Sequence, residues 1–217
     1  MKNLLNATLA LVFSMTTALV HSQDTKATAI LDQLSKDMQQ YESVSASFKS
    51  KMTDKQSATE VKQEGSIKVS GDSYKVVIGD FTVISNGETV WTYSKKSNEV
   101  MIDLAEDIYD EEGIEPAQLF TIWETGFNNQ YVGLETLNGT SCHVIKLFPK
   151  DPKDKSFHTI KLYIDKDAME MKRAVIYGKE GNDIEYDLTS FDVGYINSSE
   201  FKFDKTKFPG VEVIDNR

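Results

Sequence analysis

Three glycine-containing dipeptides divide residues 65–94 into four short segments, and this spacing constrains the fold more than any other feature of the chain. Gly71-Asp72, Gly79-Asp80 and Asn86-Gly87 separate runs in which apolar and polar side chains alternate. Asn-Gly is the strongest short hairpin signal, because both positions of a type I′ turn require positive φ. Links this short cannot contain a crossover helix. We therefore predict an antiparallel meander over residues 65–94.

The segments on either side extend this pattern. Apolar residues from Asp24 to Tyr41 recur at the spacing of one helix face, and Val44 begins a half-exposed strand. Further strands are predicted at 141–148, 158–165, 171–178 and 183–194. The sequence thus predicts an α+β fold with one long amino-terminal helix and a sheet of about ten or eleven strands. So many sequential antiparallel strands twist and curl, which creates a concave face that must be filled or covered.

The middle of the chain differs in composition. Residues 101–130 are acidic at first and then apolar, and Pro116 is placed as a first-turn helix residue. We expect two short helices here, over Leu104–Glu111 and Pro116–Thr125. They are the available cover for the concave face besides the amino-terminal helix.

Hairpin register decides which side chains share that face. If each glycine-containing dipeptide is a two-residue loop, Val83 pairs with Val90, Ile78 with Phe81 and Val69 with Tyr74. Trp91 and Tyr93 then fall on the opposite face, where they brace the hairpin or pack under a neighbouring segment. The other face is free of charge, and we assign it to the concave side. Its residues are Ile67, Val69, Tyr74, Val76, Ile78, Phe81, Val83, Val90 and Thr92.

Periodicity leaves two interpretations of this face open. A core filled by the first helix and a ligand cavity beneath helices give the same apolar pattern. The candidate cavity also includes apolar positions of the strands at 141–148 and 158–165. As a binding site, its residues are Ile67, Val69, Tyr74, Val76, Ile78, Phe81, Val83, Val90, Ile145, Leu147, Leu162 and Ile164.

The amino terminus has the features of a secretory signal peptide. Lys2 precedes an apolar stretch from Leu4 to Val20, and Val20 and Ser22 are small residues suited to a cleavage site. The stretch is shorter than the roughly 20 apolar residues needed to span a membrane. We expect removal of residues 1–22 and export of a single domain, 23–217. The single cysteine, Cys142, excludes an intramolecular disulfide.

The residues needed for catalysis or for a cofactor are not apparent. Cys142 and His143 adjoin on a predicted strand, so their side chains point to opposite faces and cannot form a dyad. The net charge of −10 disfavours nucleic acid and anionic lipid. We therefore expect a binding protein without enzymatic activity, cofactor or metal. An acidic cluster lacks calcium-loop spacing and is interpreted as a solvated helix face; it comprises Asp103, Glu106, Asp107, Asp110, Glu111 and Glu112.

Several stretches carry a resemblance in order along the chain. They are "YESVSASFKSKMTD", "EVKQEGSIKVSG", "FTVISNGETVWTYSKKSNEV", "PAQLF" and "YINSSEFKFDKTKFPGVEVID". Over nearly its whole length the chain resembles the periplasmic outer-membrane lipoprotein carriers of the LolA type. The resemblance implies an incomplete antiparallel β-barrel whose helical lid covers an apolar cavity for lipoprotein acyl chains. It also implies a periplasmic location, an inner-membrane ABC transporter as donor and delivery to the outer membrane.

Lid control is where this chain departs from that family. The family's "PAQLF" region corresponds to lid helices, and we hypothesise that Leu119, Phe120, Ile122 and Trp123 alternate between packing on the sheet and moving aside. The family usually has an Arg-Pro pair where this chain has Gly71, Asp72 and Ser73. A binder of another lipid and a lipid-sensing regulatory domain of the same fold remain alternatives. We expect a free-standing monomeric domain, which favours a carrier over a sensor.

Overall fold

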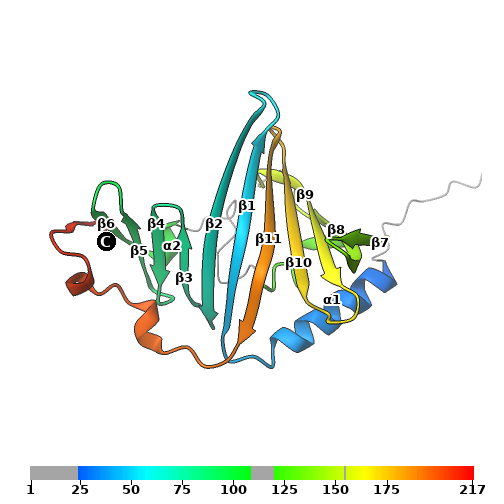
Figure 1. Ribbon diagram of the computed structural model, residues 1–217, viewed down its shortest axis with the longest axis horizontal. Coiled ribbons are helices and arrows are strands. Elements are labelled where there is room, and N and C mark those ends of the chain that lie inside the picture. Colours follow the sequence, from blue (N-terminus) through cyan, green and yellow to red (C-terminus); the bar gives the residue numbers. More distant parts are fainter. Residues whose placement is uncertain (1–23, 109–119, 154) are drawn as a thin grey trace, which may run out of the picture.

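The computed structural model describes residues 24–108, 120–153 and 155–217, and within these a single unclosed sheet dominates (Figure 1). The predicted unclosed antiparallel sheet with an amino-terminal helix is confirmed, although the sheet has twelve strands rather than ten or eleven. The elements are α1 (Thr25–Met38), β1 (Val44–Asp54), β2 (Thr59–Ser70), β3 (Ser73–Ile78), β4 (Phe81–Ser85), β5 (Thr89–Ser94), β6 (Glu99–Leu104), α2 (Ala105–Ile108), β7 (Phe127–Leu137), β8 (Thr140–Pro149), β9 (Phe157–Asp165), β10 (Met171–Gly178), β11 (Asn182–Val193), the 3₁₀ helices η2 (Ser198–Phe201) and η3 (Lys205–Lys207), and β12 (Glu212–Asp215).

The strand order is β12-β6-β5-β4-β3-β2-β1-β11-β10-β9-β8-β7. Two meanders, β2–β6 and β7–β11, are therefore joined through β1, which pairs with β2 on one side and β11 on the other. All these pairs are antiparallel, whereas β12 adds to β6 in parallel. Figure 1 shows β1, β2 and β11 as the longest strands, at the centre of the sheet.

Two of the three predicted hairpin registers are confirmed. Val69 pairs with Tyr74 and Ile78 with Phe81, as the two-residue turns require. The third register was wrong, because Val90 pairs with Ser85 and not with Val83. Asn86 lacks the positive φ of a type I′ turn, and its Oδ1 instead accepts hydrogen bonds from the backbone N–H groups of Glu88 and Thr89 at 3.0 and 2.8 Å. The error is two residues, so each side chain keeps its predicted face.

Residues 99–137 differ most from the sequence-based expectation. Two strands were missed: β6, whose last residue is Leu104, and β7 at the sheet edge, where polar residues hide the alternation. The predicted helix Leu104–Glu111 is represented only by α2, and residues 109–111 lie outside the described part. The predicted helix Pro116–Thr125 is wrong over 120–125, which form turns; its earlier residues are not described. β-branched residues in this stretch lower its helix propensity.

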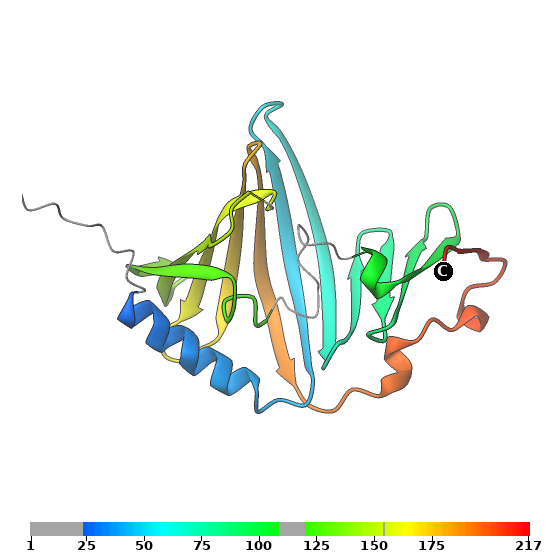
Figure 2. The same cartoon turned by 180° about the vertical axis from the view of Figure 1, so that it is seen from behind.

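Helix α1 covers one end of the concave face (Figure 2). It buries Ala27, Leu31 and Leu34 against apolar side chains of β8 and β9. The Asp24 side chain caps the helix by accepting from Lys26 and Ala27 N–H at 3.0 and 3.2 Å. Its other oxygen accepts from Tyr131 N–H on β7 at 3.0 Å, and these bonds, that of Tyr131 foremost, lower the pKa of Asp24. One carboxylate therefore caps the helix and occupies a donor on the edge strand.

Residues 194–211, which we call the C-terminal strap, contact side chains of β2, β3 and β5 on the opposite, convex face. Tyr93 packs on the strap with ring centroids 4.4 Å from Phe208, which confirms its predicted place under a neighbouring segment. The Glu200 carboxylate bridges the Lys68 and Lys75 ammonium groups at 3.0 and 3.2 Å. Figure 1 shows the strap running from β11 to β12 at the far edge of the sheet. It therefore links the central strands to the outermost one.

We expect Glu200→Gln to loosen the strap. The two lysines hold the pKa of Glu200 below its usual range, so their contribution is complete above about pH 4.5 and is lost as the pH falls through the lowered pKa. The variant should reduce the free energy of unfolding at pH 7 by no more than about 1 kcal/mol, because the pair is partly exposed. Denaturant unfolding at pH 7 and pH 3 checks this. A deficit equal at both values would contradict it, and Glu64→Gln, in an exposed pair with Lys49, is the control.

Candidate functional site

A cavity of about 390 Å³ lies on the concave face. Its walls come from β1–β3 on one side and from the start of β9 through β11 on the other, and residues 120–122 lie across it. The lining residues are Ala46, Phe48, Ile67, Val76, Ile78, Phe120, Ile122, Ser156, Phe157, Ile160, Leu162, Met171, Ala174, Ile176, Ile184, Tyr186 and Leu188.

Cross-strand pairing gathers these side chains because partners in a ladder share a face. Phe48 on β1 lies opposite Gly65 on β2 and contacts Tyr186 on β11 edge to face, with centroids 5.6 Å apart. A Cβ on Gly65 would stand 2.5 Å from the Phe48 ring. The missing side chain thus allows the ring to lie over β2. The glycine shapes this wall of the cavity.

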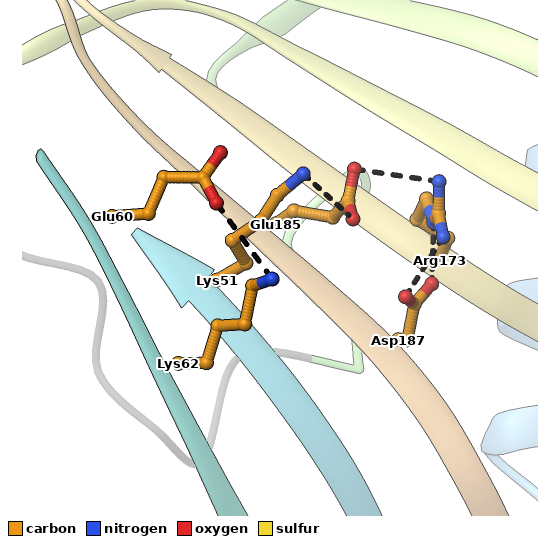
Figure 3. A network of polar contacts seen from close by, with 6 residues as sticks. All are labelled: Lys51, Glu60, Lys62, Arg173, Glu185 and Asp187. Atoms are coloured by element: carbon orange, nitrogen blue, oxygen red, sulfur yellow. Dashed lines mark hydrogen bonds and ion pairs between the residues drawn. The ribbon is translucent and has the colours of Figure 1, made fainter. Parts of the chain in front are cut away.

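Among the described lining residues Tyr186 is the one ionisable side chain, and burial raises the pKa of its hydroxyl, which keeps it neutral. Charges from the same strands point to the convex face, where Arg173 forms an ion pair with Asp187 and lies 3.3 Å from a Glu185 oxygen (Figure 3). Lys51 pairs with Glu185 at 3.7 Å, while Lys62 and Glu60, also drawn, pair on β2. Alternation along β11, and along β10 apart from its irregularity after Met171, therefore separates the apolar lining from the charged convex face.

Residues 120–126 form the segment at the cavity that corresponds to the predicted lid. Phe120 packs on Ala46 and Ile67, and its ring centroid lies 5.9 Å from that of Phe191. The Trp123 indole N–H donates to Ser35 Oγ on α1 at 2.8 Å. Phe120 also lines a second cavity of about 50 Å³, near the end of α1. The segment is thus attached to both the sheet and α1.

The predicted site residues fall into distinct places. Of the proposed lid, Phe120 and Ile122 line the cavity, Trp123 lines the small one, and Leu119 lies outside the described residues. The predicted cavity residues that line the cavity are Ile67, Val76, Ile78 and Leu162. The others share a face with these but do not line the cavity.

Those other residues divide by burial. Ile145, Leu147 and Ile164 are fully buried in the cluster that includes α1. Tyr74 and Val90 are also fully buried, and Val69 packs on the cluster of Ala46. Phe81 and Val83 extend the same face beyond the cavity, and 49% of Phe81 is exposed. The periodicity of the sequence correctly placed all of these residues on the concave face. The position of α1 decided that Ile145, Leu147 and Ile164 became part of the core.

The sequence-based analysis missed the wall made by β10 and β11. Met171, Ala174 and Ile176 come from β10, and Ile184, Tyr186 and Leu188 from β11. The signal was clear in "DIEYDLT", where Asp183, Glu185, Asp187 and Thr189 alternate with the lining residues, and weaker in "MKRAVIYG", where the irregularity after Met171 interrupts the alternation. Pairing those segments across the Glu180-Gly181 turn would have extended the face.

Neither metal coordination nor a transmembrane helix is evident in the described ranges. No group of three or more His, Cys, Asp or Glu side chains there is placed to hold a metal ion, and Asp110–Glu112 of the acidic cluster fall outside them. No helix there is long and apolar enough to cross a membrane.

Comparison with known proteins identifies the family. The model of the outer membrane lipoprotein carrier protein LolA matches residues 39–204, and the chain therefore belongs to the LolA family. No curated protein sequence matches significantly. An uncharacterized conserved protein from Thermus thermophilus is similar in structure at 12% identity and TM-score 0.57, over 88% of this chain and 99% of that one. This likeness shows the fold alone.

Two further solved structures are more distant. A putative outer membrane lipoprotein-sorting protein domain from Vibrio parahaemolyticus has 11% identity and TM-score 0.45, over 82% of this chain and 96% of that one. The lipoprotein LppX of Mycobacterium tuberculosis has 17% identity and TM-score 0.43, over 80% of this chain and 98% of that one.

Ser35→Ala should release the segment around Trp123 from α1. Loss of the hydrogen bond from the Trp123 indole is expected to reduce the free energy of unfolding by about 1 kcal/mol and to shift indole emission to the red. A Trp91→Phe background leaves Trp123 as the only tryptophan. Gln33→Ala, on the exposed side of α1, is the matched control. Unchanged emission and stability would show that this bond does not hold the segment.

Proposed function

We propose that this protein is a periplasmic carrier that binds lipoprotein acyl chains in the apolar cavity and shuttles them from the inner to the outer membrane. The observation that carries the proposal is a cavity of about 390 Å³ in which none of the described lining residues is charged. Membership of a family described as outer membrane lipoprotein carriers supports the choice of ligand. A carrier of this kind binds and releases its ligand without forming a covalent bond to it.

Burial of the acyl chain supplies the binding energy. Each methylene removed from water contributes about 0.8 kcal/mol, so a cavity that encloses part of a chain holds it firmly. Leu162, Ile176 and Leu188 make apolar contacts with the chain and have no polar group that would need a hydrogen-bond partner. A headgroup or cargo protein would stay outside, because the described lining residues carry no charge that could pair with it.

Release follows from competition for the same surface. Phe120 and Ile122 form part of the cavity lining, and we propose that an entering chain competes with them for the apolar surface of the sheet. Whatever free energy their packing on Ala46 and Ile67 contributes is subtracted from ligand affinity. A segment that returns to the sheet as the ligand leaves would assist delivery. In this chain the proposed closing contacts are apolar, together with the hydrogen bond from Trp123 to Ser35.

The remaining parts of the proposal concern location and partners. We propose that residues 1–22 are removed on export, leaving 23–217 as a monomeric periplasmic domain. The donor would be an inner-membrane lipoprotein-releasing ABC transporter, and the acceptor a component of the outer membrane. The family description supports the outer membrane as the destination.

A second candidate ligand is a single-chain lipid. The volume of about 390 Å³ is near the lower end of the roughly 300–1,000 Å³ typical of small-molecule sites. Mass spectrometry of material that copurifies from the periplasm separates the two candidates. Acylated lipoproteins support the carrier, and one small lipid species supports the alternative.

Ala174→Phe tests the cavity itself. The added ring should fill space between β9 and β11, leave the fold intact and weaken acyl-chain binding at least about tenfold, the equivalent of about 1.4 kcal/mol. Titration with a fluorescent fatty acid measures the loss. Val132→Phe adds comparable bulk at an exposed position of β7 as a control. Equal affinity in wild type and Ala174→Phe would refute the cavity as the binding site.

Tethering the segment at Phe120 tests its movement. Phe120→Cys and Phe191→Cys replace rings whose centroids are 5.9 Å apart, and a short cleavable thiol cross-linker should prevent ligand uptake until it is cut. The native Cys142 is fully buried, and burial raises the pKa of its thiol, so it competes little for the reagent. Each single variant carrying the reagent is the control. Undiminished uptake by the tethered protein would rule out the proposed movement.

A further inference from the structure

An exposed apolar row continues the cavity wall across the outer strands. Val76, which lines the cavity, pairs with Val83 on β4, and Val83 pairs with Thr92 on β5. Thr92 pairs with Met101 on β6, and Met101 with Ile214 on β12. Cross-strand partners share a face, so these side chains form one line on the concave side. We call Val83, Thr92, Met101 and Ile214, together with Phe81 beside Val83, the outer row.

The outer row is open to solvent. Phe81, Met101 and Ile214 are 49%, 43% and 38% exposed, although each is a large apolar side chain. Large exposed apolar surface on a protein commonly marks a binding site. The adjoining row of the same face, Tyr74, Ser85 and Val90, is by contrast fully buried. On the outer strands, the exposed apolar side chains of this face therefore belong to the outer row, which begins beside the cavity at Val76.

We propose that the outer row is a second acyl-chain track, occupied by a further chain of the ligand whose first chain fills the cavity. This inference rests on the proposed function and narrows the ligand to lipids with more than one chain. A multi-chain lipid overfills about 390 Å³, so its additional chains need apolar surface outside the cavity. The outer row provides such surface, and its partly exposed Val83 and Thr92 connect the cavity wall to Met101 and Ile214.

The dimensions of the row suit an acyl chain. Neighbouring strands are about 4.8 Å apart, so the four intervals from β3 to β12 span about 19 Å. One leaflet of a bilayer's hydrocarbon core is about 15 Å thick, which approximates the reach of one chain. A chain leaving the cavity at Val76 would thus be supported along its length.

The chemistry of the strip also favours a chain over a protein segment. The strands from β3 to β12 pair with one another, and the outer edge of β12 lies at the side of the sheet, so this face itself offers a partner no backbone hydrogen bonds. A peptide would therefore bury its polar groups without partners, whereas an acyl chain has none. Glu99, Asp103 and Glu212 on the last two strands share this face and limit the track to its middle line.

The test compares ligands with one and three chains. Met101→Asn combined with Ile214→Asn changes two paired, exposed residues and should weaken binding of a synthetic triacylated lipopeptide at least about tenfold. Binding of palmitate, a single chain, should change less than about twofold, because the cavity is untouched. Val213→Asn is the matched control, since Val213 is 39% exposed beside Ile214 and points to the other face.

Photo-crosslinking of the unaltered protein gives a second readout that does not depend on a variant. A lipopeptide with diazirines in its acyl chains should label peptides of β4 and β6 as well as those of β10 and β11, whereas diazirine palmitate should label only the cavity strands. Lipopeptide labels confined to the cavity strands, or equal lipopeptide affinity in the double variant, would overturn the track. If palmitate still binds wild type but not Ala174→Phe, the proposed function survives that result.

Two other outcomes have separate meanings. If the wild type binds neither palmitate nor lipopeptide, the proposed function fails, and the track fails with it. If sedimentation shows a ligand-free dimer that the double variant abolishes, the outer row serves a second copy of the chain, and the track is refuted.

Discussion

The pairing of β1 with β11 is the contact on which the rest of the structure depends. It joins residues about 140 positions apart, such as Ala46 and Phe191, and so unites two meanders that are otherwise local in sequence. The register of this pair shifts between Ser47 and Phe48, so that Phe48 lies opposite Leu188. Without the pair, β2–β6 and β7–β11 would be separate sheets, and the cavity between them would have no back wall.

Incomplete cover follows from the size of that united sheet. Helix α1 is 14 residues long and buries its face on β8 and β9, so it cannot also reach β3–β6. Phe120 and Ile122 cover the region next to α1, and beyond them the concave face is exposed at Phe81, Met101 and Ile214. On the convex side, charged residues such as Arg173 pair with one another in solvent, and Tyr93 packs against the C-terminal strap. That face therefore needs no apolar ligand to cover it. The asymmetry places apolar binding surface on one side of a single sheet.

The accuracy of sequence-based prediction varied with how local the determining interaction was. The Gly71 and Gly79 turns, each with φ of +56°, produced the predicted registers, because turn geometry is set within four residues. At Asn86 the side chain took hydrogen bonds that a type I′ turn would not provide, and the loop lengthened. β7 was missed because an edge strand has one paired side and tolerates polar residues such as Asn128, Asn129 and Gln130. Residues 120–125 were expected to be helical, but contacts of Phe120 and Trp123 outweigh weak helix propensity there.

The sequence by itself determined the class of fold, the face on which each hairpin side chain lies and the absence of charge from the concave face over residues 65–94, because alternation and turn chemistry act between near neighbours. The tertiary structure alone decided which apolar residues became core and which line a cavity. Ile145 and Leu162 lie on paired strands with the same pattern, yet only Leu162 reaches the cavity. The difference arises from where α1 and Phe120 rest on the sheet, and those positions depend on packing between distant segments that periodicity does not encode.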